Sequence, residues 1–135
     1  MEKMDEEKKQ RVLVVDDDTL MREVLKAILR SEGFAVAGEA MDGRAGIAQV
    51  EHRRPDAVCL DVNMPGISGL DTLKILREKF PGVRVVMITG DASMATVREA
   101  VSFGAVGYII KPFNAGRVGD ALRAALKPAG EWAAV

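Results

Sequence analysis

Five polar residues with complementary chemistry follow four short apolar runs of this chain. Asp16 and Asp17 follow the run VLVV, Asp61 follows AVCL, Thr89 follows VVMI, and Lys111 follows YII. If these runs are parallel strands of one sheet, their carboxyl ends meet along one edge, which is where open α/β sheets bind ligands. We therefore expect three carboxylates, one hydroxyl and one ammonium group to converge there.

These groups suit a divalent cation and a phosphoryl group. Close carboxylates repel one another by a few kcal/mol at an effective dielectric constant of about 20, so a positive charge must lie between them. One Mg²⁺ ion and the ammonium of Lys111 would balance three carboxylates. Carboxylate, carbonyl and water oxygens are the ligands that Mg²⁺ prefers, and Mn²⁺ should substitute for it.

Asp61 is the predicted phosphoryl acceptor, because an aspartate carboxylate can attack phosphorus to give an acyl phosphate. The metal, Lys111 and the hydroxyl of Thr89 would stabilise the charge that spreads over the transferring oxygens. Taken singly, each of these residue types at a strand end is more often a turn, cap or loop residue. Their joint occurrence at successive strand ends favours a functional site.

The elements that would position these residues alternate as βα units of a parallel sheet. The predicted strands lie near 11–15, 35–39, 57–60, 84–88 and 107–110. The predicted helices lie near 19–32, 43–53, 69–79, 93–103 and 115–127. Asp18 or Thr19 can cap the first helix, and Gly33 and Gly104 can close the first and fourth, since glycine tolerates the left-handed conformation common at helix ends.

Length and composition fit one domain. The 135 residues carry 19 Lys plus Arg against 20 Asp plus Glu, so no broad basic field attracts nucleic acid. We expect a charged extension at 1–10, one domain at 11–127 and a short tail at 128–135. The chain shows neither a signal peptide nor an apolar run near the ~20 residues of a membrane helix, so we expect a cytoplasmic location. The single cysteine, Cys59, lies in an apolar run and should be an inert, buried thiol.

The first predicted helix carries more apolar residues than one buried stripe requires. At ~100° per residue, they cover more than half of the helix circumference. Either the helix is deeply embedded, or part of it forms a docking surface for a partner helix beside the acidic site. Some of these residues should stay exposed: Leu20, Met21, Val24, Leu25, Ala27, Ile28 and Leu29.

Four segments resemble the receiver domains of bacterial two-component response regulators, in the order and spacing of that family. They are VLVVDDD, LDVNMPGISGLDTL, VVMITGDA and FGAVGYIIKPF, and the resemblance covers about residues 10–127. Single-domain chemotaxis-type regulators are the most similar type. The resemblance implies a flavodoxin-like receiver fold, an α/β protein with a five-stranded parallel sheet in the order 2-1-3-4-5 and five helices on its two faces.

The resemblance also implies a role for each site residue. Asp61 matches the phosphorylated aspartate, and Asp17, Asp61 and the backbone carbonyl of Asn63 match direct Mg²⁺ ligands. Asp16 matches the acid that holds the metal through water. Thr89 and Lys111 match phosphoryl contacts, and the Lys111–Pro112 bond is cis in the family.

A conformational switch follows from the same resemblance. Phosphorylation would draw Thr89 toward Asp61, and Tyr108 would turn into the space that Thr89 leaves. The surface formed by the helix near 93–103, the strand near 107–110 and the helix near 115–127 would then change. Asn63 and Asp91, each two residues beyond a site residue, would set the lifetime of the phosphoryl group.

The sequence thus predicts a response regulator that accepts a phosphoryl group on Asp61 from a sensor histidine kinase or a phosphotransfer protein. It would control a downstream protein that the sequence does not identify, as a monomer or weak homodimer, without binding nucleic acid or inserting into a membrane. It would catalyse only its own phosphorylation and dephosphorylation, and is not a conventional enzyme.

Three alternatives remain open at this point. A haloacid-dehalogenase-like phosphatase uses similar residues, but it opens with an Asp-x-Asp motif, whereas Asn63 stands here in place of the second acid. A nucleotide-binding flavodoxin-like module would need a glycine-rich loop after the first strand, where this chain has three acids. A phosphate-independent adaptor of receiver fold would not need its complete set of site residues.

Overall fold

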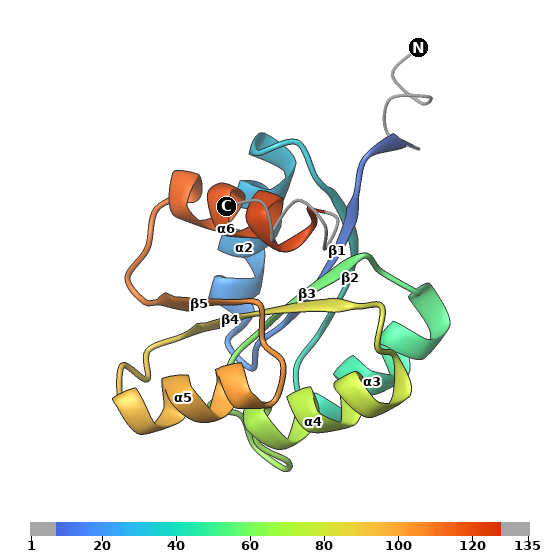
Figure 1. Ribbon diagram of the computed structural model, residues 1–135. Helices are drawn as coiled ribbons and strands as arrows, with labels where there is room; N and C mark the ends of the chain where they lie inside the picture. The colour runs from blue at the N-terminus through green and yellow to red at the C-terminus, as the bar shows by residue number, and fades with distance from the viewer. Residues whose placement is uncertain (1–7, 128–135) are drawn as a thin grey trace.

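The computed structural model describes residues 8–127 and shows a parallel sheet covered by helices on both faces (Figure 1). The strands lie in the order β2-β1-β3-β4-β5, and every neighbouring pair is parallel. The predicted fold class and strand order are confirmed. The elements are β1 (Arg11–Val15), α2 (Thr19–Ser31), β2 (Ala35–Ala40), α3 (Gly43–Arg53), β3 (Ala57–Leu60), α4 (Gly69–Lys79), β4 (Arg84–Thr89), α5 (Met94–Ser102), β5 (Gly107–Ile110) and α6 (Ala115–Ala125).

The predicted element ends agree with the structure to within two residues. The largest difference is at α6, which ends at Ala125, because Leu126 is already the cap and its N–H donates to the carbonyl of Leu122. Most of the predicted extension at 1–10 and all of the tail at 128–135 lie outside the described residues. Those two boundaries therefore stay predictions.

Helix ends follow the predicted chemistry. Asp18, rather than Thr19, is the N-cap of α2, and its carboxylate accepts hydrogen bonds from the N–H groups of Leu20 at 2.9 Å and Met21 at 3.3 Å. Gly33 and Gly104 have φ angles of 92° and 98°. Both are in the left-handed region that a non-glycine residue adopts only at a cost.

Two apolar layers form the core, one on each face of the sheet. Successive residues of a strand point to opposite faces. Val12 and Val14 of β1 belong to the cluster that contains residues of α2 and α6, whereas Leu13 and Val15 belong to the cluster with residues of α3, α4 and α5. These two groups of helices cover opposite faces of the sheet (Figure 1). The central strand β3 is buried along its whole length. Burying each large aliphatic side chain contributes about 1.5–3 kcal/mol, so the sheet is a rigid base for the residues at its edges.

Cys59 lies in the middle of this core. It is 1% exposed, packs in the layer under α2 and α6, and forms no disulfide. Burial raises the pKa of its thiol to about 12. Since the thiolate is the reactive form, the prediction of an inert thiol is confirmed.

The apolar residues of α2 divide between the core and the surface. Leu25 and Leu29 are buried, whereas Leu20 is 72% exposed and Val24 is also exposed. The helix is therefore not fully embedded, and the expectation that some of these residues stay exposed is confirmed. Within residues 8–127, no helix is long and apolar enough to cross a membrane.

Candidate functional site

Three carboxylates converge at the carboxyl edge of the sheet, as the sequence predicts. Asp16 and Asp17 follow β1 and Asp61 follows the neighbouring strand β3, so parallel pairing brings them together. One oxygen from each carboxylate lies within 4.8 Å of the other two. Asp16 is 1% exposed and Asp61 is 7% exposed, whereas Asp17 faces solvent. We call these three residues the acid cluster.

Lys111 contacts two members of the acid cluster. Its Nζ lies 2.9 Å from Oδ2 of Asp16 and 3.2 Å from Oδ2 of Asp61. Its backbone N–H donates to the carbonyl of Thr89 at 2.8 Å, which fixes the residue just beyond β5. The Lys111–Pro112 peptide is cis, in agreement with the resemblance.

The protonation states of Asp16 and Lys111 depend on each other and on the charge of Asp61. Burial raises the pKa of the Asp16 carboxyl, although hydrogen bonds from the Asp18 N–H and from Lys111 partly oppose that effect. Burial alone would lower the pKa of Lys111, but hydrogen bonds to Asp16 and Asp61 and the charges of both acids raise it overall. Lys111 is therefore an ammonium at neutral pH and offsets part of the charge of the two buried acids.

Asp61 is held in place through both its backbone and its side chain. Its N–H donates to the carbonyl of Val15 at 3.1 Å, and its Oδ1 accepts from the N–H of Asn63 at 3.2 Å. The start of α4 packs directly against it, because a Cβ added at Gly69 would lie 1.9 Å from the carbonyl oxygen of Asp61. Sequence reasoning missed this glycine, although its place after Ser68, the N-cap of α4, could have marked a close approach.

Arg22 supports the other side of the acid cluster and was also missed. Its Nη1 donates to the carbonyl of Asp16 at 2.7 Å, and its Nε donates to Glu39 at 2.9 Å. Glu39 also pairs with Lys26. The sequence carried a signal for this contact. Arg22 follows Asp18, the N-cap of α2, by one helical turn, so it lies at the same edge of the sheet as the acids.

Thr89, Tyr108 and Asp91 form a second group beside the acid cluster. The buried hydroxyl of Thr89 accepts from the N–H of Asp91 at 3.3 Å, and the Tyr108 hydroxyl donates to the Asp91 carbonyl at 2.6 Å. Within residues 8–127, no hydrogen bond joins Thr89 or Tyr108 to the acid cluster. Burial, followed by the charge of Asp91, raises the pKa of Tyr108, so its hydroxyl stays protonated at neutral pH.

The side chain of Asp91 is bonded within its own loop. Its carboxylate accepts from the N–H of Ser93 at 2.9 Å and from the hydroxyl of Thr96 at 3.1 Å. The hydrogen bonds from Ser93 lower the pKa of the Asp91 carboxyl. Asn63 lies in the exposed loop after β3, so the two predicted rate-tuning residues stand on different loops at this edge.

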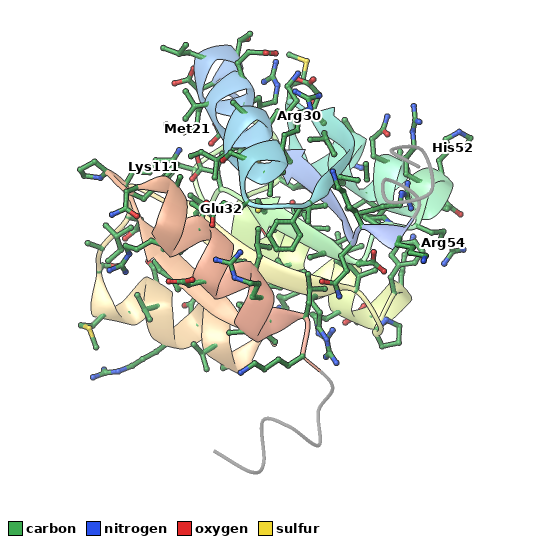
Figure 2. All side chains as sticks on the ribbon, turned by 90° about the horizontal axis from the view of Figure 1, so that it is seen from above. Met21, Arg30, Glu32, His52, Arg54 and Lys111 are labelled. Atoms are coloured by element: carbon green, nitrogen blue, oxygen red, sulfur yellow. The ribbon has the colours of Figure 1, made fainter. Side chains whose placement is uncertain are left out.

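The donor set at this edge fits a hard divalent cation. Three carboxylates, one of them exposed to solvent, offer oxygen ligands of the kind that Mg²⁺ binds while it keeps several waters. Figure 2 shows Lys111 on the same side of the molecule as Met21 at the start of α2, whereas His52 and Arg54 lie on the opposite side. The acid cluster and Lys111, which contacts it, lie together at the carboxyl edge of the sheet.

Known proteins are similar to this chain in sequence and in fold. The chain matches the response regulator receiver domain family over residues 12–123. It is 38% identical over 112 residues to the chemotaxis protein CheY of Thermotoga maritima, covering 83% of this chain and 93% of that protein. It is 47% identical over 109 residues to the protein-glutamate methylesterase/protein-glutamine glutaminase of Pyrococcus abyssi, covering 78% of this chain and 29% of that protein.

A solved structure extends the similarity. The CheX-CheY-BeF3-Mg²⁺ complex from Borrelia burgdorferi contains a chain that matches with a TM-score of 0.85 and 28% identity, covering 88% of this chain and 90% of that chain. The chain described here therefore belongs to the receiver domains of response regulators, which are signalling domains of two-component systems. Within that family it is similar to CheY proteins over nearly their full length. The predicted family is confirmed, and the phosphatase and nucleotide-binding alternatives lose their support.

Proposed function

We propose that this chain accepts a phosphoryl group on Asp61 from the phosphohistidine of a sensor histidine kinase or phosphotransfer protein. The observation that carries this proposal is the placement of Asp61, whose Oδ2 lies 3.2 Å from the ammonium of Lys111 and beside the carboxylates of Asp16 and Asp17. A carboxylate in this position is almost buried but borders the solvent-exposed Asp17. A phosphoryl donor can therefore reach Asp61 at the edge of the sheet.

The residues would divide the work as follows. Asp16, Asp17, Asp61 and the backbone carbonyl of Asn63 would hold Mg²⁺, for which Mn²⁺ can substitute. The bound ion would supply positive charge to the oxygens of the transferring group. Lys111 would offset part of the charge of the buried acids before transfer and would contact the phosphoryl group after it. The hydroxyl of Thr89 would donate to one of the phosphoryl oxygens.

The reaction requires little covalent chemistry from the protein. An oxygen of Asp61 attacks phosphorus and the bond between phosphorus and the donor imidazole nitrogen breaks. The donor ring, protonated on its other nitrogen, leaves as neutral imidazole. The product is an acyl phosphate, which water later hydrolyses to restore the carboxylate. Asn63 and Asp91 would tune that hydrolysis through the approach of water, so the chain promotes only its own modification and its reversal.

Two surfaces would carry the signal. The exposed side chains of Leu20 and Val24 lie on α2, the helix that follows the acids of β1, and suit docking of a helix from the donor protein. On the other side, α5, β5 and α6 would form the output surface, where Met94, Val101 and Ile110 are exposed. The hydrogen bond from Tyr108 to Asp91 ties this output surface to the loop that follows Thr89.

The proposed setting completes this function. The chain would work in the cytoplasm as a monomer or weak homodimer and would control a downstream protein rather than nucleic acid. The net charge of −1 is consistent with a protein partner. Chemotaxis and other two-component pathways both fit this proposal.

Intact-mass analysis tests the proposal. Wild type and Asp61→Asn are incubated with Mg²⁺ and a small acyl phosphate donor, and the adduct is followed over time. We expect a labile phosphoryl adduct that requires metal and is missing in Asp61→Asn. A wild type without an adduct would instead favour the phosphate-independent adaptor, and turnover of an aryl phosphate would favour the phosphatase.

A further inference from the structure

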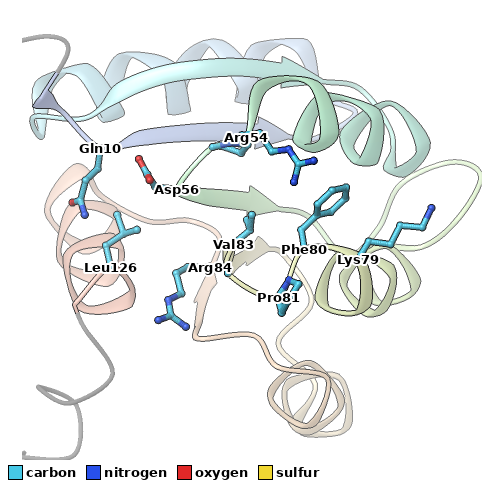
Figure 3. A pocket seen from close by; sticks show the side chains of 11 residues that line it. Gln10, Arg54, Asp56, Lys79, Phe80, Pro81, Val83, Arg84 and Leu126 are labelled. Carbon is cyan, nitrogen blue, oxygen red and sulfur yellow. The ribbon is translucent and has the colours of Figure 1, made fainter.

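A groove lies at the amino edge of the sheet, opposite the acid cluster (Figure 3). It is bordered by the starts of the strands and by the ends of α3, α4 and α6, and its volume is about 420 Å³. Cavities of this size hold small ligands or several side chains of a peptide. No residue of the proposed phosphoryl site lines it, so an activity here would be separate from that site.

The groove carries an excess of positive charge. Arg54, Lys79 and Arg84 line it, and among the described residues of its lining Asp56 is the one acid. The carboxylate of Asp56 already accepts a hydrogen bond from the backbone N–H of Arg11 at 2.8 Å. Within residues 8–127, neither Arg54 nor Lys79 forms a salt bridge. The groove is therefore basic, although the whole chain has a net charge of −1.

Arg54 occupies a backbone position that favours glycine. It follows the last turn of α3 with a φ of 49° and a ψ of 60°, in the left-handed region. Its guanidinium carbon lies 5.1 Å from the centre of the Phe80 ring. The chain thus places a long cationic side chain over an aromatic wall of the groove at a backbone position where glycine would be less strained.

Other arginines hold the walls of the groove in place. Nη1 of Arg11 donates to the carbonyls of Arg53 at 2.8 Å and Arg54 at 3.1 Å. Nη1 of Arg77 donates to the carbonyls of Pro81 at 2.8 Å and Val83 at 3.1 Å. These bonds brace the backbone of both loops, and braced walls lower the entropy cost of binding.

We propose that this groove binds an extended acidic segment of a partner protein. Figure 3 shows Arg84 and Lys79 on opposite sides of Phe80 and Pro81, so the cations are spread along the groove and an apolar surface lies between them. An extended chain with alternating acidic and apolar side chains matches this spacing better than one compact anion does. The acid cluster at the opposite edge would disfavour binding of the same acidic segment there, so the segment should bind only at the amino edge.

Fluorescence anisotropy with a defined probe tests this proposal on the full chain. The probe is a labelled peptide of about nine residues in which Glu alternates with Leu, about 30 Å long when extended. The matched probe has Gln in place of every Glu. The groove variant combines Arg54→Gly with Arg84→Gln, and Arg98→Gln on α5 is the control that removes one positive charge elsewhere. Arg54→Gly also relieves the left-handed backbone, and a thermal melt verifies that each variant is folded.

We expect the Glu peptide to bind wild type and Arg98→Gln equally, and the groove variant about tenfold or more weakly, the loss of roughly one strong charged contact. The Gln peptide should bind weakly to all three proteins. Equal binding of the Glu peptide to wild type and a folded groove variant would overturn the proposal. So would failure of wild type to bind, which includes the case in which another segment of this chain already fills the groove.

Discussion

At the scale of single residues, the main feature is an ammonium group that bridges two buried carboxylates. Lys111 contacts Asp16 and Asp61, and Asp17 stays exposed beside them. The same three acids therefore have two different environments. Asp16 and Asp61 share one counter-charge within the protein, whereas the carboxylate of Asp17 is exposed to solvent.

This difference predicts the effect of Asp17 on metal binding. At a Mg²⁺ concentration ten times its Kd, binding should stabilise the folded wild type by about 1.4 kcal/mol. Asp17→Asn should lose most of this stabilisation, because one ligand charge is gone while the pair of Lys111 with Asp16 is untouched. Thermal unfolding with and without Mg²⁺ measures the effect. Asp71→Asn, an exposed acid on α4, should keep it, and an equal loss in Asp71→Asn would contradict the prediction.

A second prediction concerns Lys111 in the absence of metal. Lys111→Met should lower the free energy of unfolding at neutral pH by about 1–3 kcal/mol, since two buried carboxylates would face each other without a counter-charge. Because the pKa of Lys111 is raised in the folded chain, its stabilisation is complete at neutral pH and is lost only as the pH rises through that alkaline value. Urea unfolding at neutral pH measures the difference.

The control for Lys111 is Lys79→Met, which removes an exposed ammonium. Its expected effect on stability is within about 0.5 kcal/mol. If both variants lose the same amount of stability, the contacts of Lys111 with Asp16 and Asp61 have no special weight.

At the scale of helices and strands, the sequence predicts most of the fold because its signals are local. Apolar runs of three or four residues followed by Asp, Thr or Lys define four of the five strands and their functional ends. Asp18 and Gly33 mark the limits of α2 by their own conformational preferences. These features need no knowledge of distant residues, so one sequence is sufficient to predict them.

Contacts between distant segments are the part that the sequence did not predict. The bond from Arg22 to the Asp16 carbonyl, the bond from Tyr108 to Asp91, and the packing of Gly69 on Asp61 join different elements. Each depends on the relative placement of a helix and a strand to within about an ångström. Side-chain periodicity fixes only which face a residue occupies.

Gly69 gives a prediction at this scale. Gly69→Ala should destabilise the fold by about 2–4 kcal/mol or displace the Asp61 backbone, because the new Cβ would overlap the carbonyl oxygen of Asp61. Gly82→Ala should change stability by no more than about 0.5 kcal/mol, since no atom lies within 4 Å of its added Cβ. Urea unfolding compares the two variants, and a mild Gly69→Ala would show that α4 can shift away from β3 at little cost.

At the scale of the whole molecule, the two edges of the sheet differ in charge. The carboxyl edge holds the acid cluster, and the amino edge holds the basic groove. Between the two edges lie the two apolar layers of the core, one on each face of the sheet. Partners bound at the two proposed sites would therefore not compete for the same surface.

The link from site to output surface is tested at Tyr108. Tyr108→Ala should leave phosphorylation of Asp61 intact because, among the described residues, the Tyr108 hydroxyl bonds to the Asp91 carbonyl and not to the acid cluster. It should, however, uncouple α5, β5 and α6 from the site. Amide hydrogen exchange with and without Mg²⁺ and beryllofluoride measures the coupling, and intact mass measures the phosphorylation. We expect a much smaller change in exchange at α5 in Tyr108→Ala than in wild type.

Tyr108→Phe separates the two contributions of the tyrosine. It keeps the ring but loses the hydrogen bond to the Asp91 carbonyl. An unaltered response in Tyr108→Ala would remove Tyr108 from the switch. A response that is lost in both variants would assign the coupling to the hydroxyl.

The reactivity of Cys59 can report how often the interior of this protein opens. The thiol lies at the centre of the sheet, two residues before Asp61, and has no reactive thiolate while the chain is folded. A thiol reagent can therefore modify it only when the central strands open. The rate of modification reports how often the middle of the fold opens, and any ligand that binds only the closed form slows it, without a dye or an introduced label on the protein.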